Sequence, residues 1–137
     1  MTVLYKAQVQ DVINQIIEVD YSDLTSGTAY DAIKLPAGAV LLGGTYWVLA
    51  AFNSGTSDAA TVTFNGLTLI NDTDAQAKVR TEFTMPTTTV ADVDKVSVST
   101  PTFVKLTWTG TGDAASAGKV RIAVNYIVKG RSFTTEK

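Results

Sequence analysis

Residues 119–128 indicate the fold class most directly, because they read Lys-Val-Arg-Ile-Ala-Val-Asn-Tyr-Ile-Val. Apolar side chains occupy every second position from Val120 to Val128, and the positions between them are mostly charged, small or polar. An alternation with a period of two predicts a β-strand that buries one face. Residues 102–109 show the same pattern, with Trp108 on the apolar face.

The rest of the chain also favours strands over helices. Threonine, valine, alanine and glycine are abundant, and β-branched side chains fit a pleated strand better than a helix. A helix is the competing interpretation for residues 7–18, but the run 16–19 and the downstream patterns favour a strand. In that strand Ile13, Ile17 and Val19 share one face. The other expected strand regions are 29–35, 39–52, 60–70, 78–84, 94–99, 102–109 and 119–128.

Short segments containing glycine or proline separate these strands. Pro36 to Gly38 predicts a chain reversal, because proline cannot donate to a ladder and glycine readily adopts a positive φ. Asn65-Gly66 between apolar runs is typical of a two-residue hairpin, and Gly43-Gly44 predicts a bulge or bend. The expected loops are 21–27, 53–58, the exposed segment 71–77 and a long hairpin tip at 109–118.

About eight short strands without a convincing helix predict an all-β protein, a single-domain antiparallel β-sandwich that is jelly-roll-like. At 137 residues the chain suits one domain with its own core. We expect the sandwich to span residues 11–129. Residues 1–10 are expected to form an N-terminal arm and residues 130–137 a C-terminal tail, because neither segment has a strong pattern.

The chain contains no cysteine and no histidine. This removes disulfides, thiolate nucleophiles and the side chain most often used as a general base or metal ligand. Carboxylates remain, but Glu18 and Glu82 occupy expected outward strand positions and Glu136 lies in the expected tail. A catalytic carboxyl group needs a desolvated setting that these positions do not provide. We therefore expect no enzymatic activity and no cofactor.

Charge and hydropathy limit the classes of partner and ligand that we expect for this chain. The net charge is −2 and the eleven basic residues are scattered, so we expect no nucleic-acid partner. No apolar run has the length of a membrane-spanning helix, and we expect no membrane partner. The pairs Asp72/Asp74 and Asp92/Asp94 carry oxygen ligands that suit calcium, but their spacing lacks the glycine and glutamate of an EF-hand loop. We expect no metal site.

The segment 46–52 is apolar on both faces, with Tyr46, Val48 and Phe52 on one side and Trp47 and Leu49 on the other. Such a strand is central in a sandwich or covered by a partner on its second face. We therefore take Tyr46, Trp47 and Leu49 as the candidate protein-contact surface.

The two tryptophans have different expected places. The alternation around Trp108 favours the core over a sugar-stacking platform, whereas core and surface are about equally favoured for Trp47.

Several stretches together resemble a known group of proteins. They are Asp23-Leu24-Thr25-Ser26-Gly27, Ile33 to Val40, Ala51 to Asp58, Leu106 to Gly112 and Ala117 to Arg121. Over roughly residues 20–128 the chain resembles small virion structural proteins of tailed bacteriophages. Residues 65–81 match that group poorly, and the N-terminal arm does not match it. The resemblance implies a capsid decoration or cement protein, often a jelly roll, that binds and stabilises the lattice of the major capsid protein.

Partners and location follow from the same resemblance. It implies the major capsid protein as partner, a homo-oligomer that we expect to be a dimer or trimer, and a place on the capsid surface of the virion. Met1 to Lys6 lack the features of a secretory signal, so we expect synthesis in the host cytoplasm.

The alternative function is a head-fibre or tail module that binds a host cell-surface glycan. It would use exposed aromatic side chains and the polar loops at 53–58, 71–77 and 109–118.

Overall fold

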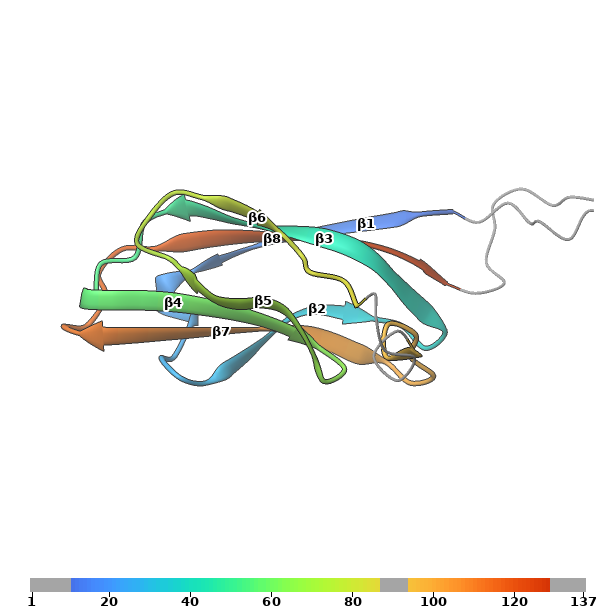
Figure 1. The fold of residues 1–137 in the computed structure, drawn as a ribbon. Coiled ribbons are helices and arrows are strands. Elements are labelled where there is room, and N and C mark those ends of the chain that lie inside the picture. The colour runs from blue at the N-terminus through green and yellow to red at the C-terminus, as the bar shows by residue number, and fades with distance from the viewer. Residues whose placement is uncertain (1–10, 87–93, 129–137) are drawn as a thin grey trace, which may run out of the picture.

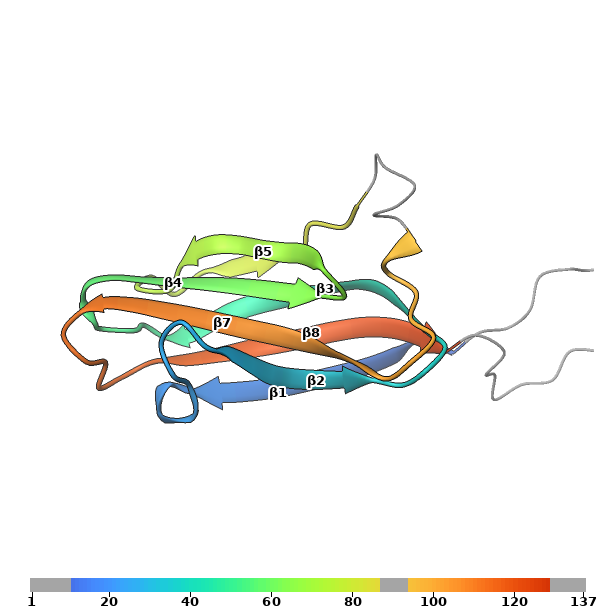
Figure 2. The same cartoon turned by 90° about the horizontal axis from the view of Figure 1, so that it is seen from below.

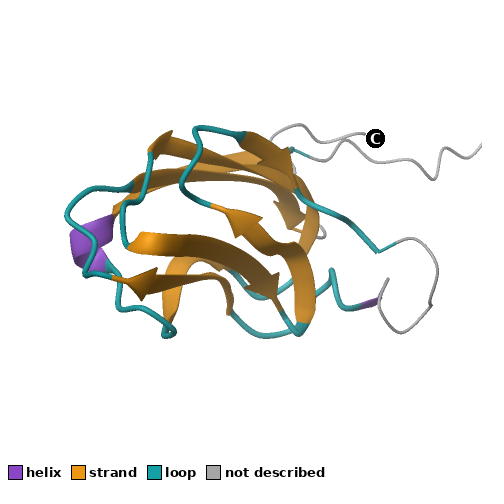
Figure 3. Cartoon of the chain, turned by 60° about the vertical axis from the view of Figure 1, so that its left-hand side comes forward, coloured by secondary structure: helices purple, strands orange, loops and turns teal. Residues whose placement is uncertain are grey.

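The computed structural model describes residues 11–86 and 94–128. It contains two four-stranded antiparallel sheets packed face to face (Figures 1 and 3). The predicted all-β, single-domain β-sandwich is therefore confirmed. Its strands are β1 (Ile13–Asp20), β2 (Ala29–Leu35), β3 (Ala39–Ala50), β4 (Gly55–Phe64), β5 (Leu67–Asp74), β6 (Arg80–Glu82), β7 (Thr102–Gly112) and β8 (Lys119–Val128). A short 3₁₀ helix, η1 (Tyr21–Asp23), follows β1.

The sheet order shows how the chain is wound. One sheet has the order β1-β8-β3-β6, which we call the first sheet, and the second sheet has the order β2-β7-β4-β5. The hydrogen-bonded pairs are nested, since β1 pairs with β8, β2 with β7, β3 with β6, and β4 with β5. The chain is thus a long hairpin folded over on itself, with its strands distributed between the two layers (Figure 2).

The core lies between the sheets and is built from the apolar positions that the alternation selects. In β8 the side chains of Val120, Ile122 and Val124 are at most 1% exposed, and in β7 those of Val104 and Leu106 are fully buried. The strand choice at the N-terminus is confirmed, because β1 pairs with β8 without interruption and buries Val19. Burial of these side chains supplies the main stabilising free energy of the sandwich.

The predicted turns and bend are also present. Asn65 and Gly66 have φ angles of 50° and 82°, which is the conformation of the two-residue hairpin turn between β4 and β5. The bulge in β3 lies at Leu42, where the pairing with β8 shifts between Leu41 and Gly43. Gly44, two residues after the bulge, packs against Phe83 so closely that a Cβ atom would have no room.

Several expected loops are strands in the structure. β4 begins at Gly55 inside the expected loop 53–58, β5 continues to Asp74, and β7 continues to Gly112. These polar residues form ladders because their partners are in place, as in the pairing of Asp58 with Gly110. Ala75, in the segment expected to be exposed, is fully buried.

The expected strand at 94–99 was wrong, because this segment contains only an isolated bridge between Ser97 and Val40. The strand expected at 78–84 is reduced to the three residues of β6.

The expected arm at 1–10 and tail at 130–137 lie outside the described residues. The start of β1 and the end of β8 lie side by side at one end of the sandwich, since Ile13 pairs with Tyr126 (Figure 1). Among the described residues, no helix has the length and hydropathy needed to cross a membrane.

Candidate functional site

The outer face of the first sheet carries a row of four side chains that lie directly opposite one another. Glu18 of β1 pairs with Arg121 of β8, Arg121 pairs with Trp47 of β3, and Trp47 pairs with Arg80 of β6. We call these four residues the Trp47 row. The register of four strands, which come from distant parts of the sequence, therefore assembles one aromatic ring, two cations and one carboxylate.

The charged side chains of the Trp47 row contact the Trp47 ring, one another and neighbouring charged residues. The guanidinium groups of Arg80 and Arg121 lie 5.1 Å and 5.8 Å from the centre of the Trp47 ring, within the range of cation–π attraction. Arg121 also donates a hydrogen bond of 3.0 Å to Glu18, and Lys119 lies 3.5 Å from the same carboxylate. The hydrogen bond from Arg121, aided by the positive charge of Lys119, holds the pKa of Glu18 below its ordinary value.

The three residues of the candidate protein-contact surface, Tyr46, Trp47 and Leu49, do not all lie on one face of the sheet. Trp47 and Leu49 are both partly exposed, and Trp47 lies on the outer face of the first sheet. Tyr46 points to the opposite face and is fully buried in the core. Because neighbouring residues of a strand face opposite sides, Tyr46 is not available to a partner, and the structure corrects its assignment to the surface.

Further exposed apolar side chains lie in or next to the strands of the first sheet, outside the Trp47 row. Ile16 of β1 is 64% exposed, and Leu42 at the bulge of β3 is 46% exposed. Val12, just before β1, is 55% exposed. Ile16, Leu42 and the two arginines were not predicted as site residues from the sequence. The alternation within each strand can be read from the sequence. Which side chains of different strands lie next to one another depends on the register between the strands, which a single sequence does not reveal.

Trp108 lies in the core as the alternation favoured, at 7% exposure. It packs against Phe52 with a distance of 5.2 Å between ring centres, and its indole N–H donates a hydrogen bond to the buried carboxylate of Asp58. Asp58 also accepts hydrogen bonds from Ser54 and Gln76. Asp58 is thus saturated by neutral donors and fixes the start of β4, which is a structural role.

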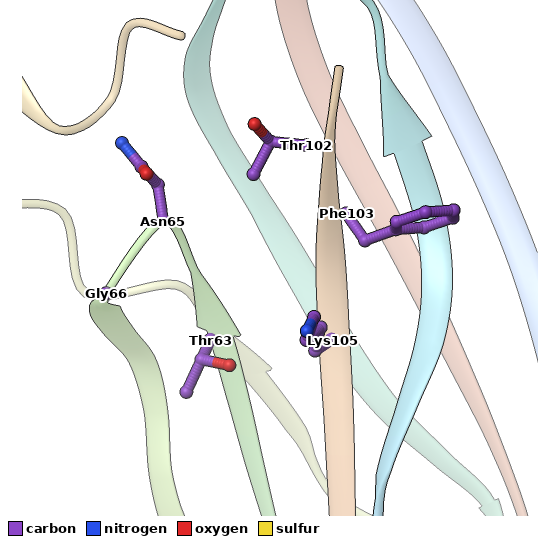
Figure 4. Close-up of a pocket in the computed structure, with 6 residues that line it drawn as sticks. All are labelled: Thr63, Asn65, Gly66, Thr102, Phe103 and Lys105. Carbon is purple, nitrogen blue, oxygen red and sulfur yellow. The ribbon is translucent and has the colours of Figure 1, made fainter. Parts of the chain in front are cut away.

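A shallow hollow lies on the outer face of the second sheet, with a volume of about 390 Å³. Figure 4 shows its lining, with Asn65 and Gly66 at the hairpin turn and Lys105 on β7. The Phe103 ring points away from the turn, towards β2, where the Lys34 ammonium lies 5.8 Å from its centre. The charged side chain in this lining is that of Lys105, and the lining contains no carboxylate.

Within residues 11–86 and 94–128, no group of three or more acidic side chains is arranged to hold a metal ion. Asp72 and Asp74 belong to β5, where Asp74 accepts a hydrogen bond from the backbone of Gln76. Asp92 of the second sequence pair lies outside the described residues.

No family model and no curated protein sequence matches this chain. The fold is nevertheless similar to chains in solved phage capsids. The capsid structure of Helicobacter pylori bacteriophage KHP30 contains one with a TM-score of 0.58 and 17% identity, and the match covers 87% of this chain and 90% of that chain. The capsid asymmetric unit of cyanophage Pam1 contains another, with a TM-score of 0.59, 16% identity and coverage of 93% and 92%.

A third similar chain belongs to the capsid of Ralstonia phage GP4, with a TM-score of 0.55, 16% identity and coverage of 96% and 92%. Because nearly all of both chains is aligned in each case, the matched chains are close to this one in length. The protein therefore has the whole fold of small chains found in three phage capsid structures.

Proposed function

We propose that this protein is a non-enzymatic structural component of a bacteriophage virion, a capsid decoration or cement protein that binds and stabilises the lattice of the major capsid protein. The observation that carries the proposal is the end-to-end similarity of fold and length to chains of three phage capsids. The nested strand pairs support a jelly-roll assignment, an eight-stranded architecture that recurs in viral capsid domains.

The proposed contact with the capsid is the outer face of the first sheet. Tryptophan and arginine are the side chains most often found at the energetic centre of protein interfaces. The Trp47 row holds one tryptophan between two arginines, and Leu49 lies on the same strand. The cation–π contacts and the Glu18 ion pair fix these side chains before binding, which lowers the conformational entropy lost on association.

The proposed place of this protein on the capsid can be tested by measuring its copy number in purified virions of its parent phage. Quantitative mass spectrometry gives its copy number relative to the major capsid protein. A ratio near a simple fraction of the capsid protein is expected for a lattice-wide decoration role. A few copies per particle would contradict that role, and absence from the virion would overturn the proposal altogether.

The contact face can be tested with capsids that lack this protein, to which the purified protein is added back. Trp47→Ala is expected to weaken binding at least tenfold, in the range of an interface hot spot. The matched control is Phe103→Ala, which removes another partly exposed aromatic ring beside a cation, but on the outer face of the second sheet. Equal loss of binding in both variants would contradict the assignment of the face.

The alternative function is a head-fibre or tail module that binds a host glycan. In that function the partly exposed ring of Trp47 would stack against a sugar. The structure argues against it at this residue, because two guanidinium groups lie over a ring that sugar stacking would need to be open. Binding to a glycan array that disappears in Trp47→Ala, without any association with capsids, would favour this alternative.

A further inference from the structure

Three of the four strands at the sheet edges are protected from pairing with another chain. Natural proteins protect such edges with short strands, bulges, charged side chains or a covering segment. β6 is three residues long and carries Arg80 and Glu82. β2 has a bulge between Asp31 and Ile33, and β5 has an irregular register and a backbone hydrogen bond from Thr84 to Leu69 on its outer side.

The fourth edge, β1, has no bulge in its pairing with β8, no charged side chain in its first five residues, and no covering strand among residues 11–86 and 94–128. Its sequence from Ile13 to Glu18 contains no proline, lysine or arginine, and its pairing with β8 is unbroken over all eight residues. Its side chain Ile16 is apolar and 64% exposed. A long, regular edge with an exposed apolar side chain promotes association unless a specific partner covers it.

The backbone of β1 presents hydrogen-bonding groups to this open edge at even-numbered positions. The N–H group of Tyr21 bonds to the carbonyl of Gly118, in continuation of the β1–β8 register. Because an antiparallel strand alternates between its two neighbours, odd-numbered residues bond to β8 and even-numbered residues point outwards. The N–H group of Asp20 follows this pattern, because it donates to the side chain of Asp23 and not to β8. Asn14, Ile16 and Glu18 therefore carry the outward-facing N–H and C=O groups.

A groove accompanies the open edge. It has a volume of about 500 Å³ and is lined by residues 14–17 of β1 and residues 32–34 of β2. Figure 2 shows the two strands following the same side of the sandwich, one from each sheet. The side of the sandwich where the sheets meet is thus hollowed next to the unprotected strand.

We propose that β1 is a dimerisation edge, through which two copies of the chain pair antiparallel with Ile16 opposite Ile16 of the second copy. In this register Glu18 lies opposite Asn14, and Asp20 lies opposite Val12. The acidic side chains at the end of each β1 strand are thereby kept apart, and an amide can donate to each Glu18 carboxylate. A parallel pairing in register would place the same acidic residues against each other, which is unfavourable.

The pairing has a consequence for the outer face. Directly opposite residues of an antiparallel pair project to the same side of the sheet. The first sheet of one copy and the first sheet of the other become one continuous eight-stranded sheet. The Trp47 rows of both copies then face the same direction. A dimer of this form presents two identical surfaces to a repetitive lattice, where linked binding strengthens weak contacts.

The first test uses the isolated protein in analytical ultracentrifugation over a range of concentrations. We expect a dimer for the natural sequence and a monomer for Ile16→Lys, which places two ammonium groups against each other at the two-fold axis. Because Ile16 is largely exposed, the thermal melt of Ile16→Lys should show an intact fold. The matched control is Thr68→Lys, at an exposed position of the protected edge strand β5, and it should remain dimeric.

The second test reads the register with cysteines, which is straightforward because the chain has none of its own. Under mild oxidation, a mixture of Asn14→Cys and Glu18→Cys should form a disulfide between unlike variants, since opposite Cα atoms are about 5.5 Å apart. Glu18→Cys alone should not cross-link, because its two copies would lie about 14 Å apart along the strands.

A dimer that is lost in Ile16→Lys and cross-links in the mixed pair supports the proposal. A monomer at every concentration, a trimer, or a dimer unaffected by Ile16→Lys overturns it. A monomer whose binding to capsids is abolished by Ile16→Lys also overturns it, because the edge would then accept a strand of the capsid protein. The oligomeric state and the cross-link are measured on the isolated chain, so their outcomes are separate from the copy-number test of the virion role.

Discussion

The indole N–H of Trp108 and the Oδ1 atom of Asp58 are joined by a hydrogen bond of 2.8 Å between the two central strands of the second sheet. Asp58 is 2% exposed, and it also accepts bonds of 2.9 Å and 2.6 Å from Ser54 and of 3.0 Å from Gln76. A carboxylate is costly to bury unless hydrogen bonds replace its water. This group of four residues therefore holds β4, β7 and the segment after β5 in one arrangement.

Asp58→Ala is expected to lower the free energy of unfolding by about 3 kcal/mol or more, because it leaves three buried donors without an acceptor. Urea denaturation followed by tryptophan fluorescence measures the change. The matched control is Asp31→Ala, which removes an exposed carboxylate 3.9 Å from Lys105 and should cost less than about 1 kcal/mol. Similar losses for both variants would show that the Asp58 hydrogen bonds are not specially stabilising.

Asp58 also makes the free energy of unfolding depend on pH in the acidic range. Burial raises the pKa of its carboxyl group, but the hydrogen bonds from Ser54, Gln76 and Trp108 together outweigh burial and hold the pKa below its ordinary value. A group with a lowered pKa in the folded state contributes stability that is complete above its unfolded pKa, near 4, and is lost as the pH falls through the folded value. The difference in unfolding free energy between the natural chain and Asp58→Asn should therefore be constant near neutrality and shrink below about pH 4. A difference that grows on acidification would contradict this sign.

The architecture could be predicted because the alternation in β7 and β8 records which side chains are buried. The ends of several strands could not, since residues such as Gly55 and Asp58 are polar or flexible and become strand only by pairing with β7. Local patterns carry little information about such distant partners.

The candidate site was predictable only in part. Trp47 was identified by its place in a strand with two apolar faces, but its contacts with Arg80 and Arg121 depend on the registers of three strands. The surface assignment of Tyr46 was wrong because its apolar character suited either side of the sheet. Only the packing of the second sheet decides which side is covered.

Tyr46→Phe is expected to leave the stability unchanged or raise it by up to about 1 kcal/mol. The Tyr46 side chain is fully buried, and its hydroxyl group has no hydrogen-bond partner among the described residues. A buried polar group without a partner costs free energy, and phenylalanine keeps the ring while removing that group. Tyr46→Ala, by contrast, should cost about 3–5 kcal/mol through the cavity it creates. Thermal and urea unfolding compare the variants, and a loss above about 1 kcal/mol in Tyr46→Phe would reveal a hydrogen bond of the hydroxyl group.

The neighbouring glycines of β3 provide a test of the packing around the bulge. A Cβ atom on Gly44 would lie within 2.5 Å of the Phe83 ring and of the Ala123 carbonyl oxygen, whereas a Cβ atom on Gly43 would meet nothing within 4 Å. Phe83 can shift only by disturbing the core, and the Ala123 carbonyl belongs to the backbone of β8. Gly44→Ala should therefore destabilise the fold by about 1–3 kcal/mol through overpacking.

Gly43→Ala is the matched control, because its φ angle is not in the left-handed region and its added methyl group enters open space. It should be neutral, or stabilising by up to about 1 kcal/mol, since alanine restricts the unfolded chain more than glycine does. Urea denaturation of both variants under the same conditions measures the contrast. Equal stability of the two would mean that β3 and β8 can separate locally without cost, and the close approach at Gly44 would then not be what fixes their spacing.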